Sequence, residues 1–172
     1  MTSIDAEIVE RLQAKDALLF SLSDTLDVKA SIVLVVVTFL GTLSGIFLAN
    51  PLLPYLLRYG QLAAAVFLAG AGLMAFITLW PRQHELETAE TLDEWQQELR
   101  AHYKNALDPN EAVSEAFTAG RVQRLKERIQ LHTGIDRAKS NCLDWSYRLS
   151  AVALALNLTT LIWLALSLHR SF

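Results

Sequence analysis

The sequence predicts an all-α integral membrane protein with three transmembrane helices and a cytoplasmic helical hairpin, assembled as a homo-oligomer. Residues 30–49, 61–80 and 149–168 form three blocks that contain no Asp, Glu, Lys or Arg. A helix of about 20 residues rises about 30 Å, which matches the hydrocarbon core of a bilayer. Lipid offers no water to backbone groups, so each block is expected to be helical. The alternative, a soluble helical bundle, would not gather its apolar residues into three uncharged blocks.

Residues 1–28 are predicted to form a cytoplasmic amphipathic helix. Its apolar residues recur at three- and four-residue steps from Ile4 to Leu26, and no Gly or Pro separates it from the first span. We therefore expect one continuous helix that enters the membrane. The segment has neither a basic region nor a small-residue cleavage site, so we expect the first span to remain as an anchor.

The three spans are placed at residues 29–50, 60–80 and 148–169, and the distribution of Lys and Arg predicts their orientation. Of the 15 Lys and Arg residues, only Arg58 and Arg170 lie in the short loop after the first span or in the C-terminal tail. The positive-inside rule then places the N-terminus and the long middle segment in the cytoplasm and the C-terminus outside.

The middle segment, residues 82–147, is predicted to be a helical hairpin and a sensor. Residues 84–107 carry apolar side chains at helical spacing and an excess of acidic residues. A second helix is expected to begin with Asp108 as N-cap, Pro109 at the first helical position and Glu111 two residues later, as in a capping box. It should continue into the third span, with or without a bend at Gly134.

The second helix of this hairpin is basic, and its charges have two interpretations. In one, they only solvate the bundle and balance the acidic helix. In the other, they hold a phosphate-bearing ligand, because an Arg guanidinium matches phosphate oxygens and aromatic rings stack on bases. The candidate ligand-binding residues are Arg121, Arg124, Arg128, Arg137 and Tyr103.

Inside the spans, the informative residues are small or polar. Gly41 and Gly45 form a GxxxG pattern that lets two helices approach closely, and Asn157 and Thr160 need hydrogen-bond partners in lipid. These four residues are candidates for interhelical or pore contacts. Asn157 is interpreted either as a link between helices of one protomer or as part of a pore between protomers. Three spans cannot enclose a water-filled channel alone, so a pore requires an oligomer, for which we assume a tetramer.

No catalytic motif is recognisable in the chain. It has no Gly-rich phosphate loop, no CxxC pair and no zinc-protease histidine spacing, and Cys142 is its single cysteine. We expect no enzyme, no cofactor and no metal site.

Two short segments resemble a known family. The segment Asp27-Val28-Lys29-Ala30-Ser31, which opens the first span, resembles the D-x-K-A-S segment of the Pycsar transmembrane effectors, with Asp27 and Lys29 as the matching charges. Residues 135–140, before the third span, are similar to that family's polar lead-in, and the layout of the spans is also similar. SLATT-type membrane effectors are similar in layout but with two spans.

The resemblance implies a bacterial anti-phage effector of the inner membrane. A partner nucleotidyl cyclase would make a cyclic pyrimidine nucleotide, which would bind the cytoplasmic helices. The oligomer would then disrupt the membrane through a pore or channel and cause growth arrest or death. The expected partners are the lipid bilayer, other copies of the chain and the cyclic nucleotide, but no nucleic-acid duplex. The alternatives are a nucleotide- or oligonucleotide-regulated ion channel that is open at rest, or a non-conducting scaffold that docks a protein partner.

Overall fold

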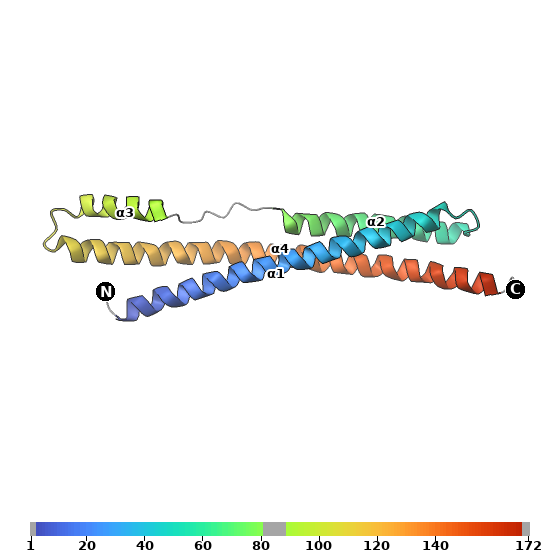
Figure 1. Ribbon diagram of the computed structural model, residues 1–172, viewed down its shortest axis with the longest axis horizontal. Coiled ribbons are helices and arrows are strands. Elements are labelled where there is room, and N and C mark those ends of the chain that lie inside the picture. The colour runs from blue at the N-terminus through green and yellow to red at the C-terminus, as the bar shows by residue number, and fades with distance from the viewer. Residues whose placement is uncertain (1–2, 81–88, 170–172) are drawn as a thin grey trace. The chain divides into compact units, whose positions relative to one another are not determined.

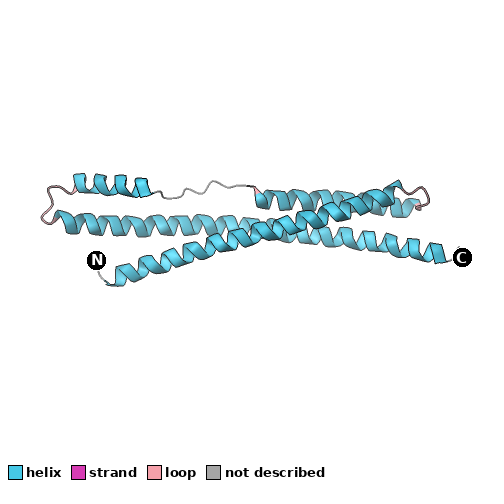
Figure 2. Cartoon of the chain, viewed as in Figure 1, coloured by secondary structure: helices cyan, strands magenta, loops and turns pink. Residues whose placement is uncertain are grey.

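The computed structural model describes residues 3–80 and 89–169, and these residues form four α-helices and no strand (Figures 1 and 2). The helices are α1 (Ser3–Ala49), α2 (Tyr55–Leu79), α3 (Ala89–His102) and α4 (Pro109–His169). The predicted all-α class is confirmed. Contacts divide the chain into two units. Unit 1 comprises the described residues of Met1–Leu22 and Pro81–Ile135, and unit 2 those of Ser23–Trp80 and Asp136–Phe172.

Two of the helices are long and belong to both units. α1 has 47 residues without a break, which confirms the predicted continuous helix. α4 has 61 residues and passes through Gly134 without interruption. Its predicted start is also confirmed, because the backbone N–H of Glu111 donates to Asp108 Oδ1 at 3.2 Å. This bond satisfies one of the amide groups that a helix N-terminus leaves without a partner.

The helix predicted for residues 84–107 ends earlier than expected. Residues 84–88 lie outside the described residues, and α3 stops at His102. The chain then turns, with the Ala106 amide donating to the Tyr103 carbonyl at 3.0 Å. Apolar spacing alone extended the prediction to Leu107. Pro109 disfavours helical geometry at the residue before it, so the chain must leave the helix before α4 begins.

In unit 2, parts of α1 and α4 pack with α2 along a buried line of residues that we call the seam. Its positions alternate at steps of three and four residues, the spacing of helices in left-handed coiled coils. Apolar seam residues form two clusters, one around Ala30, Ala75 and Leu143 and the other around Leu40, Leu68 and Ala153. Polar residues occupy many of the other seam positions: Ser23, Ser44, Gln61, Thr78, Asp136, Lys139, Ser146, Ser150, Asn157 and Thr160.

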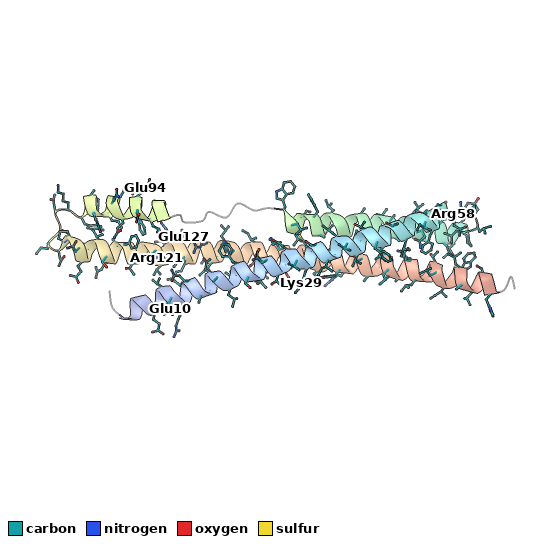
Figure 3. All side chains as sticks on the ribbon, in the orientation of Figure 1. Glu10, Lys29, Arg58, Glu94, Arg121 and Glu127 are labelled. Carbon is teal, nitrogen blue, oxygen red and sulfur yellow. The ribbon has the colours of Figure 1, made fainter. Side chains whose placement is uncertain are left out.

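α1, α2 and α4 each contain a stretch that is long and apolar enough to cross a membrane. Only 22%, 28% and 22% of these stretches is buried within the protein. Their remaining apolar side chains, Val35, Val66 and Leu158 among them, are exposed, as expected where lipid is the solvent. The charged residues labelled in Figure 3 all lie outside the uncharged blocks.

Candidate functional site

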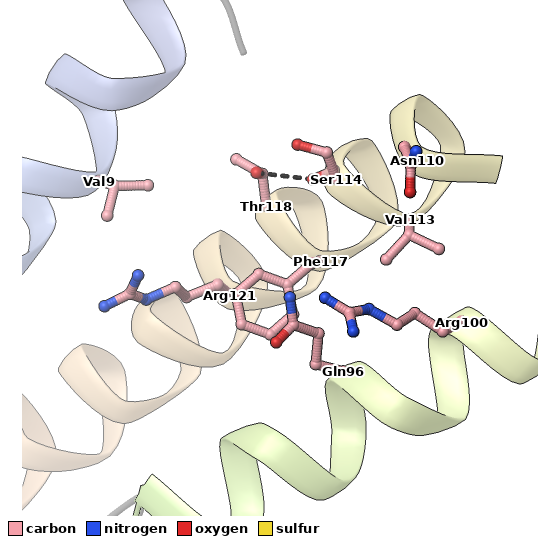
Figure 4. A pocket seen from close by; sticks show the side chains of 9 residues that line it. All are labelled: Val9, Gln96, Arg100, Asn110, Val113, Ser114, Phe117, Thr118 and Arg121. Atoms are coloured by element: carbon pink, nitrogen blue, oxygen red, sulfur yellow. Dashed lines mark hydrogen bonds between the residues drawn. The ribbon is translucent and has the colours of Figure 1, made fainter. Parts of the chain in front are cut away.

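Unit 1 contains a cavity of about 240 Å³ between α1, α3 and α4 (Figure 4). Val9 contributes from α1, Gln96 and Arg100 from α3, and the remaining lining residues come from the first four turns of α4. The full lining is Val9, Gln96, Arg100, Asn110, Val113, Ser114, Phe117, Thr118 and Arg121.

The cavity combines two cations with amide groups and an aromatic ring. In Figure 4, Gln96 and Arg100 reach from α3 toward Phe117, and Arg121 lies beside the same ring. None of the nine lining residues is acidic, so no carboxylate in the lining neutralises the two guanidinium groups. Guanidinium groups bind phosphate oxygens in bidentate fashion, and a ring can stack on a flat ligand. The arrangement therefore suits a small, planar, anionic ligand.

A tryptophan holds α3 in place against α4. The Trp95 ring lies 4.8 Å from the Phe117 ring and 4.3 Å from the guanidinium of Arg124, measured between centroids and to Cζ respectively. Gly120 provides the space for it, since a Cβ on Gly120 would lie 2.5 Å from the Trp95 ring. Gln96 follows Trp95 directly and Arg100 lies little more than one helical turn beyond it. The Trp95 contact thus sets the position of both cavity residues of α3.

Replacing Gly120 by Ala should destabilise the protein, although Ala is normally the better helix former. The added methyl group displaces the Trp95 ring, and overpacking of this kind costs about 1–3 kcal/mol. Gly134→Ala is the matched control, because a Cβ there meets nothing within 4 Å and the change should stabilise α4 by about 0.5–1 kcal/mol. Thermal unfolding followed by circular dichroism measures both. Equal shifts in Tm for the two variants would show that the packing of the Trp95 ring does not depend on the absence of a side chain at Gly120.

A second polar group in unit 1 surrounds the buried carboxylate of Asp16. Arg128 Nη2 lies 2.5 Å from Asp16 Oδ2, and His132 Nδ1 lies 3.7 Å from Asp16 Oδ1. The Phe20 ring meets His132 edge-on at 4.6 Å between centroids. Asp16 belongs to α1 and Arg128 to α4, so this ion pair links the two helices.

In unit 2, the two segments that open the first and third spans meet. Lys139 Nζ donates to Asp27 Oδ1 at 2.7 Å and to Ser23 Oγ at 3.1 Å. The Lys139 side chain is only 6% exposed and that of Asp27 is 39% exposed. Lys29, by contrast, is exposed. The charge that pairs with Asp27 therefore comes from residues 135–140, a partner that spacing along the chain did not reveal.

Hydrogen bonds join the three spans in unit 2. Ser44 Oγ donates to Asn157 Oδ1 at 3.1 Å, which links α1 to α4. Gln61 Nε2 donates to Thr160 Oγ1 at 2.6 Å, which links α2 to α4, and Ser146 Oγ donates to the Ala71 carbonyl at 2.6 Å. Asn157 thus joins α1 to α4 within one protomer, while a role in a pore between protomers stays a prediction.

A family model described as the Pycsar effector protein domain matches residues 13–168 of the 172-residue chain. The chain belongs to the Pycsar effector family. The match extends over most of both units and includes the Asp27 and Lys139 segments. Membership makes this a membrane effector of anti-phage defence, in a family associated with a cyclic-nucleotide signal from a cyclase. No curated protein and no solved structure matched the chain in the same comparisons.

The predicted ligand residues of this Pycsar effector do not gather at one place. Arg121 lines the cavity, Arg124 lies over Trp95, and Arg128 pairs with Asp16. Tyr103 follows α3 and contacts His102, while Arg137 is exposed in unit 2. The structure instead brings Arg121 together with Arg100, Gln96 and Phe117, which the sequence did not single out.

Gly41 and Gly45, which form the GxxxG pattern of the first span of the Pycsar effector, contact no neighbouring helix among the described residues. A Cβ added to Gly41 or Gly45 would meet nothing within 4 Å. Close approach at the GxxxG pattern therefore remains a prediction about contact between copies of the chain.

Proposed function

We propose that this Pycsar effector binds a cyclic pyrimidine nucleotide in the cavity of unit 1 and then disrupts the bacterial inner membrane. The infected cell would stop growing or die. Unit 1 would lie in the cytoplasm and the C-terminus outside, in line with the excess of Lys and Arg on one side of the spans. The observation that carries the proposal is the cavity with Arg100 and Arg121, because two of the three helices that form it, α1 and α4, continue into the membrane spans.

The chemistry of the cavity fits one cyclic mononucleotide. A cyclic phosphodiester bears one negative charge, which Arg100 and Arg121 can neutralise, and the base can stack on Phe117. The Gln96 and Asn110 amides each offer a donor and an acceptor to the edge of a base. Ligand sites usually measure about 300–1,000 Å³, so a cavity of about 240 Å³ suits a single nucleotide better than an oligonucleotide.

Helix continuity supplies a route from ligand to membrane. Val9 contacts the cavity from α1, and Arg121 does so from α4. Both helices run unbroken into unit 2, where they form two of the three spans. A ligand that shifts either helix in unit 1 therefore acts on the same rigid element that crosses the bilayer. We expect several copies to act together, since one protomer has only three spans.

The proposal is tested with purified full-length protein in dye-loaded liposomes. We expect cyclic CMP or cyclic UMP to release the dye, and the linear monophosphates to release none, because the linear forms carry a second negative charge and lack the ring. Empty liposomes are the control. Complete insertion of the protein with no leakage for any cyclic nucleotide would contradict the proposal. Leakage that nucleotide stops would instead indicate a channel open at rest.

A further inference from the structure

We infer that the polar seam of unit 2 becomes the water-exposed lining of the membrane lesion when the effector is triggered. The inference rests on the proposed function, since it concerns where water and ions pass. It assigns the lining to residues that are buried inside each resting protomer. The residues concerned are Ser44, Gln61, Ser146, Ser150, Asn157 and Thr160.

The distribution of polar side chains in the spans is the first argument. Ser44 and Gln61 are completely buried, and Asn157 and Thr160 are 1% exposed. The outward faces carry apolar side chains such as Val35, which is 70% exposed. A water-filled path needs hydrogen-bonding groups along its wall, and these apolar faces have few.

The outward-facing hydroxyl groups do not change this picture. Thr38, Thr42 and Thr159 each donate to the backbone carbonyl four residues earlier, at 2.8, 2.9 and 2.8 Å. These bonds satisfy the hydroxyl groups locally, so the three residues can face lipid. Ser44, Gln61 and Ser146 instead donate across helices, the first two to Asn157 and Thr160. Separation of the helices breaks these cross-helix bonds and leaves their groups free to bond water, while Asn157 and Thr160 keep local bonds to the carbonyls four residues earlier.

The seam is also incompletely satisfied at rest. Within the described part of the chain, Gln61 Oε1 and Ser150 Oγ are buried and have no hydrogen-bond partner. An unmet polar group in an apolar interior is unfavourable, and water relieves this penalty. Apolar residues at the same positions would pack without it. The polar seam therefore weakens the closed bundle and favours a hydrated, open one.

Separation within a protomer accounts for a lesion without inverting the helices. The apolar faces stay in lipid while the seam faces of several copies turn to a shared water path. Lipid does not drive helices together by the hydrophobic effect, so seam contacts set the balance between closed and open bundles. A change carried by α1 or α4 from unit 1 acts on those contacts directly.

Cysteine accessibility tests the inference in proteoliposomes of the full chain. In a Cys142→Ser background, Ser44→Cys places a nearly isosteric thiol in the seam. Thr42→Cys, two residues away on the exposed face of α1, is the matched control. The probe is a charged, membrane-impermeant thiol reagent, added with and without the cyclic nucleotide that releases dye. We expect complete loss of the free thiol at position 44 only with nucleotide, and no loss at position 42 in either condition.

A second seam variant, Asn157→Leu, keeps the test decisive if Ser44→Cys folds poorly. It should bind nucleotide normally and reduce dye release, whereas Leu158→Asn on the exposed face should leave release intact. Dye release by the Ser44→Cys protein while its seam thiol stays unmodified would overturn the inference and leave the proposed function standing. Absence of release from the wild-type protein would remove both.

Discussion

Replacing Arg121 by Glu abolishes nucleotide-induced leakage in our expectation, and replacing Arg100 by Glu does the same. Both guanidinium groups line the cavity, and no acidic residue shares the lining. A hydrogen bond to a charged group contributes about 1.5–3 kcal/mol, so Ala at either position should raise Kd by about 10- to 150-fold. Glu adds repulsion of the phosphate. Titration calorimetry with cyclic CMP and cyclic UMP measures the loss.

Two controls separate ligand contact from general charge. Arg137→Glu changes an exposed arginine of the same basic segment and should leave Kd unchanged. Arg121→Lys keeps the charge but lacks the planar fork, so an intermediate affinity is expected. If Arg137→Glu removed binding while the Arg100 and Arg121 variants retained it, the cavity would not be the ligand site.

The parts of the fold that local rules govern were predictable from sequence. Uncharged blocks indicated the spans, the absence of Gly and Pro before the first span indicated that α1 enters it without a break, and Asp108 marked the start of α4. The cavity was not predictable in this way. Arg100 belongs to the acidic helix, so a count of charge by helix assigned the site to the basic one. Arg100 and Arg121 line the same cavity only because the Trp95 ring fits over Gly120 and so positions α3. No local sequence pattern indicates that fit.

The buried charges were missed for a different reason. Counting Lys and Arg by segment finds the orientation of the spans but ignores which face of a helix each residue occupies. Asp136 and Lys139 lie on the seam at a three-residue step, whereas Arg137 between them is exposed. Continuing the three-and-four spacing of the seam backwards from the third span would have singled out Lys139, although not its partner Asp27.

Asp27→Asn should destabilise the protein more than Lys139→Met does. The Asp27 change removes the counter-charge of the Lys139 ammonium, which is 6% exposed, and leaves it only neutral acceptors, the Asn amide oxygen and the Ser23 hydroxyl. Loss of one partner of a buried pair costs about 3–5 kcal/mol. The Lys139 change leaves a carboxylate that is 39% exposed and remains hydrated, so a cost of about 1 kcal/mol is expected. Titration with SDS, followed by circular dichroism, gives the free energy of unfolding.

The double variant decides whether the pair itself produces this asymmetry. Asp27→Asn with Lys139→Met removes both charges, so it should be more stable than Asp27→Asn alone, while Lys29→Met at an exposed position should stay within about 0.5 kcal/mol of wild type.

Asp136 adds a further test. Its buried Oδ2 has no hydrogen-bond partner in the described residues, and it lies three residues before Lys139 on one helix face. If the Asp136 carboxylate pairs with the Lys139 ammonium once Asp27 is replaced, Asp27→Asn should lower the free energy of unfolding more in an Asp136→Asn background. Additive free energies in both cycles would mean that the two motif segments are joined by packing rather than by charge.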